Sequence, residues 1–263
     1  MANFLRDWFI VNVSVNEQIL RQLNELFIKR CHSLNTTLSD RDTTQNAYIN
    51  YIIRFDGKGY RIFNFDDMLR YFFQAKEIER ITFTLETTES LRSNRQTGTY
   101  IELRLDQWNP NNCCLWVASD DEDWVEVSFS ATQAILVNCK NKNGLARTAW
   151  TPLAVQIMGI AVGFFISLWA AVKLSPKLSI QNSFVICFFF VLLIFSNTWD
   201  YINQKIILLI NKIFPNLKFY RHDKDQSNWL MQAIAGGLIV AITLWIINLA
   251  LSYIINVLKG FMT

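Results

Sequence analysis

Residues whose types could support catalysis or metal binding are few in this sequence, and their spacing fits neither role. The chain has two histidines, His32 and His222. Cys31 and His32 are adjacent in a segment with helical periodicity, where neighbouring side chains point about 100° apart and cannot share a metal ion. No serine has a recognisable base and orienting acid. The sequence therefore predicts no catalytic residue, no metal site and no cofactor.

Two polar motifs resemble ligand-binding loops without having their defining residues. Residues 120–123 are four consecutive carboxylates, but they lack the spaced oxygen ligands and central glycine of a calcium loop, so we interpret them as a solvated turn. The sequence DGKG at residues 56–59 lacks the Lys-Ser/Thr ending and the following helix of a P-loop. Because it lies between the apolar runs YINYIIRF and YRIF, it predicts a β-hairpin instead.

Two hydrophobic periods indicate the elements that would position any site in the first half of the chain. Alternating apolar residues predict strands at 9–15, 81–87, 99–105 and 124–130. Helical spacing predicts one helix that Asn16 caps and a second over residues 65–77. Residues 131–141 fit either a third helix or a last strand. We expect an α+β domain with a mostly antiparallel sheet and two to three helices.

Long uncharged stretches dominate the second half and predict an all-α transmembrane bundle of about three helices. We expect spans at about 151–173, 180–199 and 229–257. The second stretch has polar flanks, so it either spans or only re-enters. Residues 201–214 place isoleucines and leucines on one helical face and lysines on another, which fits an amphipathic interfacial helix or an extension of the second span. The expected domains are residues 1–147 and 148–263.

The charges of the two parts suggest where each one lies. Residues 1–147 have 17 basic and 19 acidic residues, a net charge of −2, which argues against nucleic-acid binding by phosphate neutralisation. No signal peptide is evident, and five cysteines without a CxxC motif suggest reduced thiols. Eight Lys and Arg flank the spans on the amino-terminal domain's side and three on the other, which predicts a cytoplasmic domain. Abundant Asn, Ile, Lys and Phe are compatible with an AT-rich bacterial genome. Together with the expected spans, this composition predicts a multi-pass protein of the bacterial inner membrane.

Basic residues after the second stretch are expected at the membrane surface, facing anionic lipid headgroups. They are Lys205, Lys212, Lys218, Arg221 and Lys224.

Small residues recur every fourth position in the first and third stretches, where they would let helices approach closely. They are Gly159, Gly163, Ser167 and Ala171, then Ala233, Gly237 and Ala241. The spacing leaves open whether this packing is within one chain or between chains. Another face of the third stretch has Asn248, Ser252 and Asn256, which would either form interhelical hydrogen bonds or line a pore between several copies. We expect a homo-oligomer of four or more copies.

An α+β domain without visible catalytic residues, followed directly by a few membrane helices, resembles the layout of prokaryotic antiviral effectors. That resemblance implies a membrane effector whose cytosolic domain senses a small signalling ligand or a partner and whose helices then permeabilise or depolarise the inner membrane. Two alternatives stay open. One is a non-catalytic membrane-anchoring subunit that recruits a soluble protein, and the other is a membrane-tethered enzyme of unrecognised type.

Overall fold

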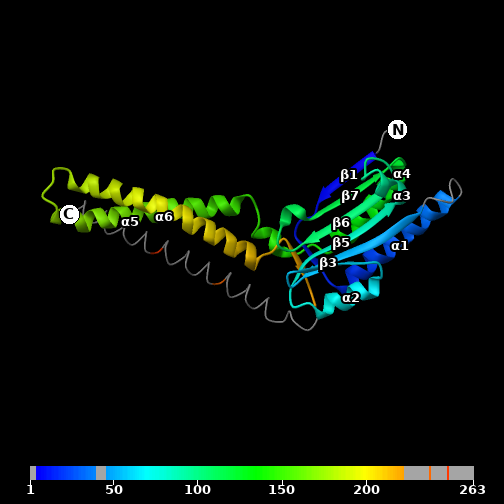
Figure 1. Ribbon diagram of the computed structural model, residues 1–263. Coiled ribbons are helices and arrows are strands. Elements are labelled where there is room, and N and C mark those ends of the chain that lie inside the picture. Colours follow the sequence, from blue (N-terminus) through cyan, green and yellow to red (C-terminus); the bar gives the residue numbers. More distant parts are fainter. Residues whose placement is uncertain (1–3, 40–45, 222–236, 238–247, 249–263) are drawn as a thin grey trace. The chain divides into compact units, whose positions relative to one another are not determined.

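The computed structural model describes residues 4–39 and 46–221, together with Gly237 and Asn248. The chain divides into two compact units, which are Met1–Gly144 with Pro215–Asp225 and Leu145–Phe214 with Gln226–Thr263. The first unit is the expected α+β domain, and the second contains the two long apolar helices (Figure 1). The chain returns to the first unit at Pro215, whereas the sequence pattern placed everything after residue 147 in the membrane part.

A six-stranded antiparallel sheet forms the centre of the α+β domain, as expected (Figure 1). Its strand order is β1-β7-β6-β5-β3-β4, and every neighbouring pair is antiparallel. The strands are β1 (Phe4–Phe9), β3 (Ala47–Phe55), β4 (Lys58–Ile62), β5 (Ile78–Thr87), β6 (Tyr100–Asp106) and β7 (Cys114–Ser119). A separate two-stranded parallel ladder joins β2 (Val13–Val15) to β8 (Leu217–Phe219).

The hairpin predicted from the DGKG sequence is confirmed. β3 and β4 pair with Phe55 opposite Lys58, so Asp56 and Gly57 form a two-residue turn. Their φ angles are 48° and 74°. Positive φ at both central residues is the requirement of a type I′ turn, which Asp-Gly satisfies at low cost.

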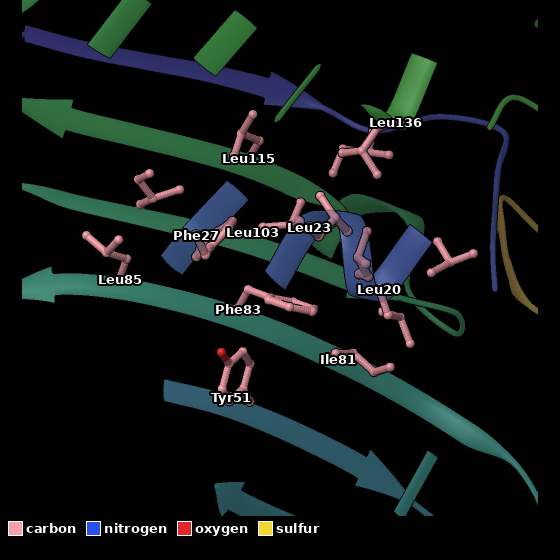
Figure 2. Close-up of a cluster of buried hydrophobic side chains, with 14 of the residues drawn as sticks. Leu20, Leu23, Phe27, Tyr51, Ile81, Phe83, Leu85, Leu103, Leu115 and Leu136 are labelled. Atoms are coloured by element: carbon pink, nitrogen blue, oxygen red, sulfur yellow. The ribbon is translucent and has the colours of Figure 1, made fainter. Parts of the chain in front are cut away.

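Helices pack against one face of the sheet and enclose the hydrophobic core. They are α1 (Glu17–Ser39), α2 (Phe65–Gln74) and α4 (Glu122–Val137). A further short helix, α3 (Thr88–Arg92), follows β5. Figure 2 shows Leu20, Leu23 and Phe27 of α1 above Phe83 of β5. The Phe27 and Phe83 rings lie 5.5 Å apart. The predicted helices are confirmed, including the Asn16 cap, whose Oδ1 accepts a hydrogen bond from Ile19 N at 3.0 Å.

The strand predicted over residues 124–130 is wrong, because these residues form the first half of α4. Asp121 caps this helix, and its Oδ1 accepts a hydrogen bond from Trp124 N at 3.1 Å. Val125, Val127 and Phe129 alternate as in a strand, but Trp124, Val125 and Phe129 are buried and Val127 is exposed, which is the pattern of one face of a helix. The carboxylates of residues 120–123 therefore belong to the start of a helix, where the macrodipole favours negative charge. Of the two alternatives for residues 131–141, the helix is correct up to Val137.

The strand predicted over residues 9–15 is interrupted. β1 ends at Phe9, β2 begins at Val13, and Asn12 between them has a φ angle of 58°. A left-handed residue cannot continue an extended strand, so the chain leaves the main sheet here. It then pairs with β8 instead.

Two helices in the second unit are long and apolar enough to span a membrane. They are α5 (Trp150–Leu174), followed by a short 3-10 turn to Lys177, and α6 (Ser183–Ile213). With 25 and 31 residues they extend about 38 and 46 Å, more than the roughly 30 Å of a hydrocarbon core. α6 runs without a break through the segment for which a separate interfacial helix was one alternative. The third expected span lies outside the described residues, except for Gly237 and Asn248.

α5 and α6 pack as an antiparallel hairpin, with small residues of α5 against aromatic residues of α6. A Cβ atom on Gly159 would overlap the Trp199 indole, and one on Gly163 would overlap the Phe195 ring. Phe195 and Trp199 are four residues apart, as Gly159 and Gly163 are, so this ridge of α6 fits the groove along the glycines of α5. At the open end, Arg147 donates to Asn211 Oδ1 at 2.9 Å and to the carbonyl of Phe214 at 3.3 Å.

We expect Gly163→Leu to separate the two helices, because its side chain would occupy the space of the Phe195 ring. The double variant Gly163→Leu/Phe195→Ala should restore packing by exchanging the large and small partners. Ala161→Leu, on the exposed side of α5, is the matched control. Thermal unfolding of the detergent-solubilised chain gives the readout. If Phe195→Ala does not rescue Gly163→Leu, the glycine row packs against something other than α6.

Candidate functional site

A small hydrogen-bonded structure joins the returning chain to the α+β domain, and we call it the stem. The stem comprises β2 with residues 10–12, β8 with Asn216, and residues 139–143. Asn216 is its buried centre: its Oδ1 accepts from Asn12 N at 2.9 Å, and its Nδ2 donates to Ile10 O at 3.0 Å. Its carbonyl also accepts from Val13 N at 3.0 Å. One asparagine thus bonds backbone groups of Ile10, Asn12 and Val13, where the chain leaves the main sheet.

The segment that leads to α5 is held by the same strand. Ser14 N donates to the carbonyl of Cys139 at 2.9 Å, and Asn141 N donates to the carbonyl of Asn12 at 2.7 Å. Asn143 Nδ2 donates to the carbonyl of Pro215 at 3.0 Å. The outgoing and returning segments are therefore both hydrogen-bonded at β2, although about 70 residues of sequence separate them.

The end of β8 is fixed to α2. Arg221 donates to the carbonyls of Ala75 and Lys76, the second at 2.7 Å, at the carboxyl-terminal end of α2. A cation at this end of a helix satisfies free carbonyls and complements the macrodipole. The Phe219 and Phe72 rings pack with centroids 6.3 Å apart. Arg221, expected at the membrane surface, thus bonds within the α+β domain.

One cavity of the α+β domain is a groove between α1, the first half of β3 and the turn that leads into α2. Its volume is about 870 Å³. Tyr51 and Asn24 meet at its floor, where the tyrosine hydroxyl donates to Asn24 Oδ1. Burial, and secondarily the nearby Cys31, raise the pKa of Tyr51 to about 12. The groove therefore has a neutral hydrogen-bonded phenol beneath it at physiological pH.

Charged side chains of both signs surround this groove. Arg21 pairs with Glu17 at 2.7 Å, and Glu25, Arg61 and Asp66 are exposed along the rim. The two arginines are balanced by carboxylates, so the groove has no excess of positive charge for a phosphate group.

The sheet face opposite the helices is a network of ion pairs. Arg95 pairs with both Glu86 and Glu102, and Arg104 also pairs with Glu102. Arg80 pairs with Asp106 at 2.7 Å. These carboxylates are almost fully buried beneath the arginines. Because each buried charge has a partner, we interpret this face as structural.

The cysteines outside the helical hairpin are poor nucleophiles. Burial raises the pKa of Cys113 to about 11, and the hydrogen bond with the Asp106 backbone lowers it by less. Burial also raises the pKa of Cys31, Cys114 and Cys139. A thiol that stays protonated reacts slowly. Within the described residues, no group of three or more His, Cys, Asp or Glu side chains is arranged to hold a metal ion.

The residues named from the sequence as site candidates separate into three groups in the structure. Gly159, Gly163, Ser167 and Ala171 are buried along α5, the two glycines against α6. Lys205 and Lys212 are exposed on α6, and Lys218 lies half-buried in β8. Asn248 and Gly237 are helical and exposed. Ala233, Ala241, Ser252, Asn256 and Lys224 lie outside the described residues.

Sequence reasoning missed both the stem and the groove. Asparagines at positions 12, 141, 143 and 216 are the available signal for the stem, since amides often satisfy backbone groups at irregular turns. The groove had a weaker signal, a polar Asn24 on the otherwise apolar face of α1.

Asn216→Ala should destabilise the α+β domain by about 2–4 kcal/mol, because it leaves one buried and one part-buried backbone group without this partner. Thermal unfolding of the full chain measures this loss. Asn111→Ala, at an exposed turn, should change stability by less than about 0.5 kcal/mol. Equal unfolding temperatures for the two variants would contradict the role of Asn216.

Tyr51 should make the domain sensitive to alkali. Its pKa is about 12 in the folded chain, against about 10 for an unfolded tyrosine. The stability gained from keeping this phenol protonated is full below about pH 10 and is lost as the pH rises to about 12. Tyr51→Phe should lose less stability over this range than Tyr60→Phe, whose ring is exposed. The same alkaline loss in both variants, followed by denaturant titration, would refute the assignment.

No protein-family model, curated protein or solved structure matches this chain.

Proposed function

We propose that the protein is a membrane-anchored sensor. Its α+β domain binds a ligand or partner in the groove beside β3, and the α5–α6 hairpin holds the domain at a bilayer and responds to binding. The observation that carries this proposal is the parallel pairing of β2 with β8, which ties the end of α6 to the domain that also precedes α5.

A bilayer is the environment that suits the hairpin. Large apolar side chains such as Ile160, Phe190 and Leu193 are more than half exposed, and the outer sides of both helices carry many others. An exposed apolar surface of this extent is unfavourable in water. Backbone groups inside each helix are satisfied within it, as a hydrocarbon environment requires.

Connectivity gives the hairpin a simple topology. The α+β domain precedes α5 at Gly144 and resumes at Pro215 after α6. If both helices cross the membrane, the two connections lie on one side, and the loop that contains Lys177 lies on the other. The excess of Lys and Arg on the domain side suggests that this is the cytoplasmic side.

A short path links the groove to the hairpin. α1 forms one wall of the groove and begins two residues after β2. β2 pairs with β8, and only residues 214–216 separate β8 from α6. A ligand that shifts α1 would therefore displace β2 and, through the ladder, the end of α6.

The output of this sensor is proposed to be permeabilisation or depolarisation of the membrane by several associated copies. The glycine row of α5 already packs against Phe195 and Trp199 of the same chain. Assembly would therefore use the outer helix faces and the third span, including Asn248, Ser252 and Asn256. The second candidate output is recruitment of a soluble protein, which the open groove in the α+β domain favours.

Site-specific labelling tests the anchoring. In a cysteine-free chain, Ser179→Cys lies in the loop between α5 and α6, and Lys58→Cys lies at the start of β4, directly after the β3–β4 turn. We expect a membrane-impermeant maleimide to label Ser179→Cys in intact cells and Lys58→Cys only after permeabilisation. Labelling of both sites, or of neither, in intact cells would contradict two crossings with a cytoplasmic domain.

A membrane-potential dye separates the two outputs in bacteria that express the full chain. Depolarisation that is reduced when Asn248, Ser252 and Asn256 are all changed to Leu supports the effector, because leucines favour a dry constriction. A stable potential together with a co-purifying partner supports recruitment. Depolarisation that persists in the triple variant would count against a path lined by these three residues.

A further inference from the structure

We propose that the groove beside β3 binds an extended peptide segment of a partner protein. The peptide would add a short strand to the first half of β3, on the edge that faces away from β5. The inference deepens the proposed sensor function, on which it rests, by naming the chemical class of its ligand.

The backbone of β3 shows which groups face the groove. Ala47 N donates to Asn35 Oδ1, and the Ala47 carbonyl accepts from Asn35 Nδ2 and from the Cys31 thiol, so these backbone groups point toward α1. In a strand, alternate residues direct their N–H and C=O groups to the same side. Ile49 and Tyr51 therefore also face away from β5.

Ile49 is left without a ladder partner on that side. β4 pairs with β3 from Tyr51 to Phe55 and ends at Ile62, where the chain turns away through Asn64 into α2. In the part of the chain that the structure describes, Ile49 pairs only with Leu85 on the other side. Its N–H and C=O therefore face the groove together. They lie between Ala47, whose backbone bonds Asn35, and Tyr51, which pairs with Ile62.

This arrangement suits an extended peptide that continues the line of β4. Such a peptide would exchange a pair of hydrogen bonds with Ile49, as strand-adding ligands do at other sheet edges. α1 borders the groove on one side and residues 63–66 border it on the other. Because the groove is walled on both sides, the ligand that we infer is a single extended segment rather than the edge of a second folded sheet.

Side chains around the groove match a peptide better than a phosphorylated ligand. Ile28, Phe63 and Leu91 line it and are 52%, 75% and 53% exposed, so they offer apolar surface to alternate side chains of the peptide. Arg61 lies on the same rim as Asp66, and Glu25 faces the groove from α1. Mixed charges of this kind suit a peptide of mixed composition and oppose a nucleotide's negative charge.

Selection from a displayed library of random 12-residue peptides on the full chain in detergent tests this inference. Selected sequences are synthesised with a fluorophore, and binding is measured by anisotropy. We expect a peptide in which N-methylation of one backbone amide weakens binding about tenfold or more, since that amide bonds the Ile49 carbonyl. A peptide that tolerates N-methylation at every position would overturn strand addition.

Matched variants locate the binding site. Ile49→Pro removes the N–H that faces the groove without removing a bond to β5, and Ile49→Val keeps that N–H. Ile28→Lys blocks the rim, while Gln22→Lys adds the same charge elsewhere on α1. We expect Ile49→Pro and Ile28→Lys each to weaken binding about tenfold and the two controls to bind like wild type. Equal binding by Ile28→Lys and Gln22→Lys, or a selection that yields no binding peptide, would overturn the proposal.

This test is independent of the proposed sensor function, because it measures binding in detergent and requires no membrane response. Peptide binding without depolarisation or partner recruitment would leave the groove assignment standing and refute the sensor. Failure of the selection, with labelling that still shows an anchored domain, would refute the groove assignment alone.

Discussion

The structure depends on one constraint, that a chain which leaves a folded domain through two long apolar helices returns to the same domain. The return is secured by three residues of β8 beside β2 and by the side chain of Asn216. A three-residue ladder is weak by itself, and its stability comes from burial of Leu217 and Phe219 in the core and from Arg221 at the end of α2. The hairpin is therefore an insertion within the α+β domain, attached at both of its ends.

This two-ended attachment changes what the hairpin can do. A helix tied at one end can rotate and tilt freely, whereas a hairpin that leaves and re-enters one domain is connected to it at both ends. The small glycines of α5 leave room for the large aromatic side chains of α6, so the two helices pack closely against each other. Such packing stabilises a helix pair in a bilayer, where the hydrophobic effect does not drive helices together. The domain can thus act on a preformed pair of helices, and the groove along α1 is where a binding event could begin that action.

Sequence patterns were informative where apolar and polar residues alternate along a strand, even though most polar residues of β5 and β6 are also buried in the structure. Residues 81–87 and 99–105 alternate in this way, and Asp56-Gly57 can hardly form anything but a tight turn. The pattern failed at residues 124–130, where apolar residues two and four apart fit a strand as well as a helix, and the Asp121 cap decided the outcome. β8 has only three residues, too few to show a periodic pattern. The groove forms where α1 lies next to the half of β3 that does not pair with β4. Contacts between distant segments of this kind have no local signature.

Amide hydrogen exchange of the full chain in nanodiscs shows whether the stem couples the α+β domain to the helical hairpin. With Asn216→Ala, we expect faster exchange in β2 and β8 and also in the last turn of α6, with β5 and β6 unchanged. Faster exchange confined to β2 and β8, with the end of α6 protected as in the wild-type chain, would contradict the coupling.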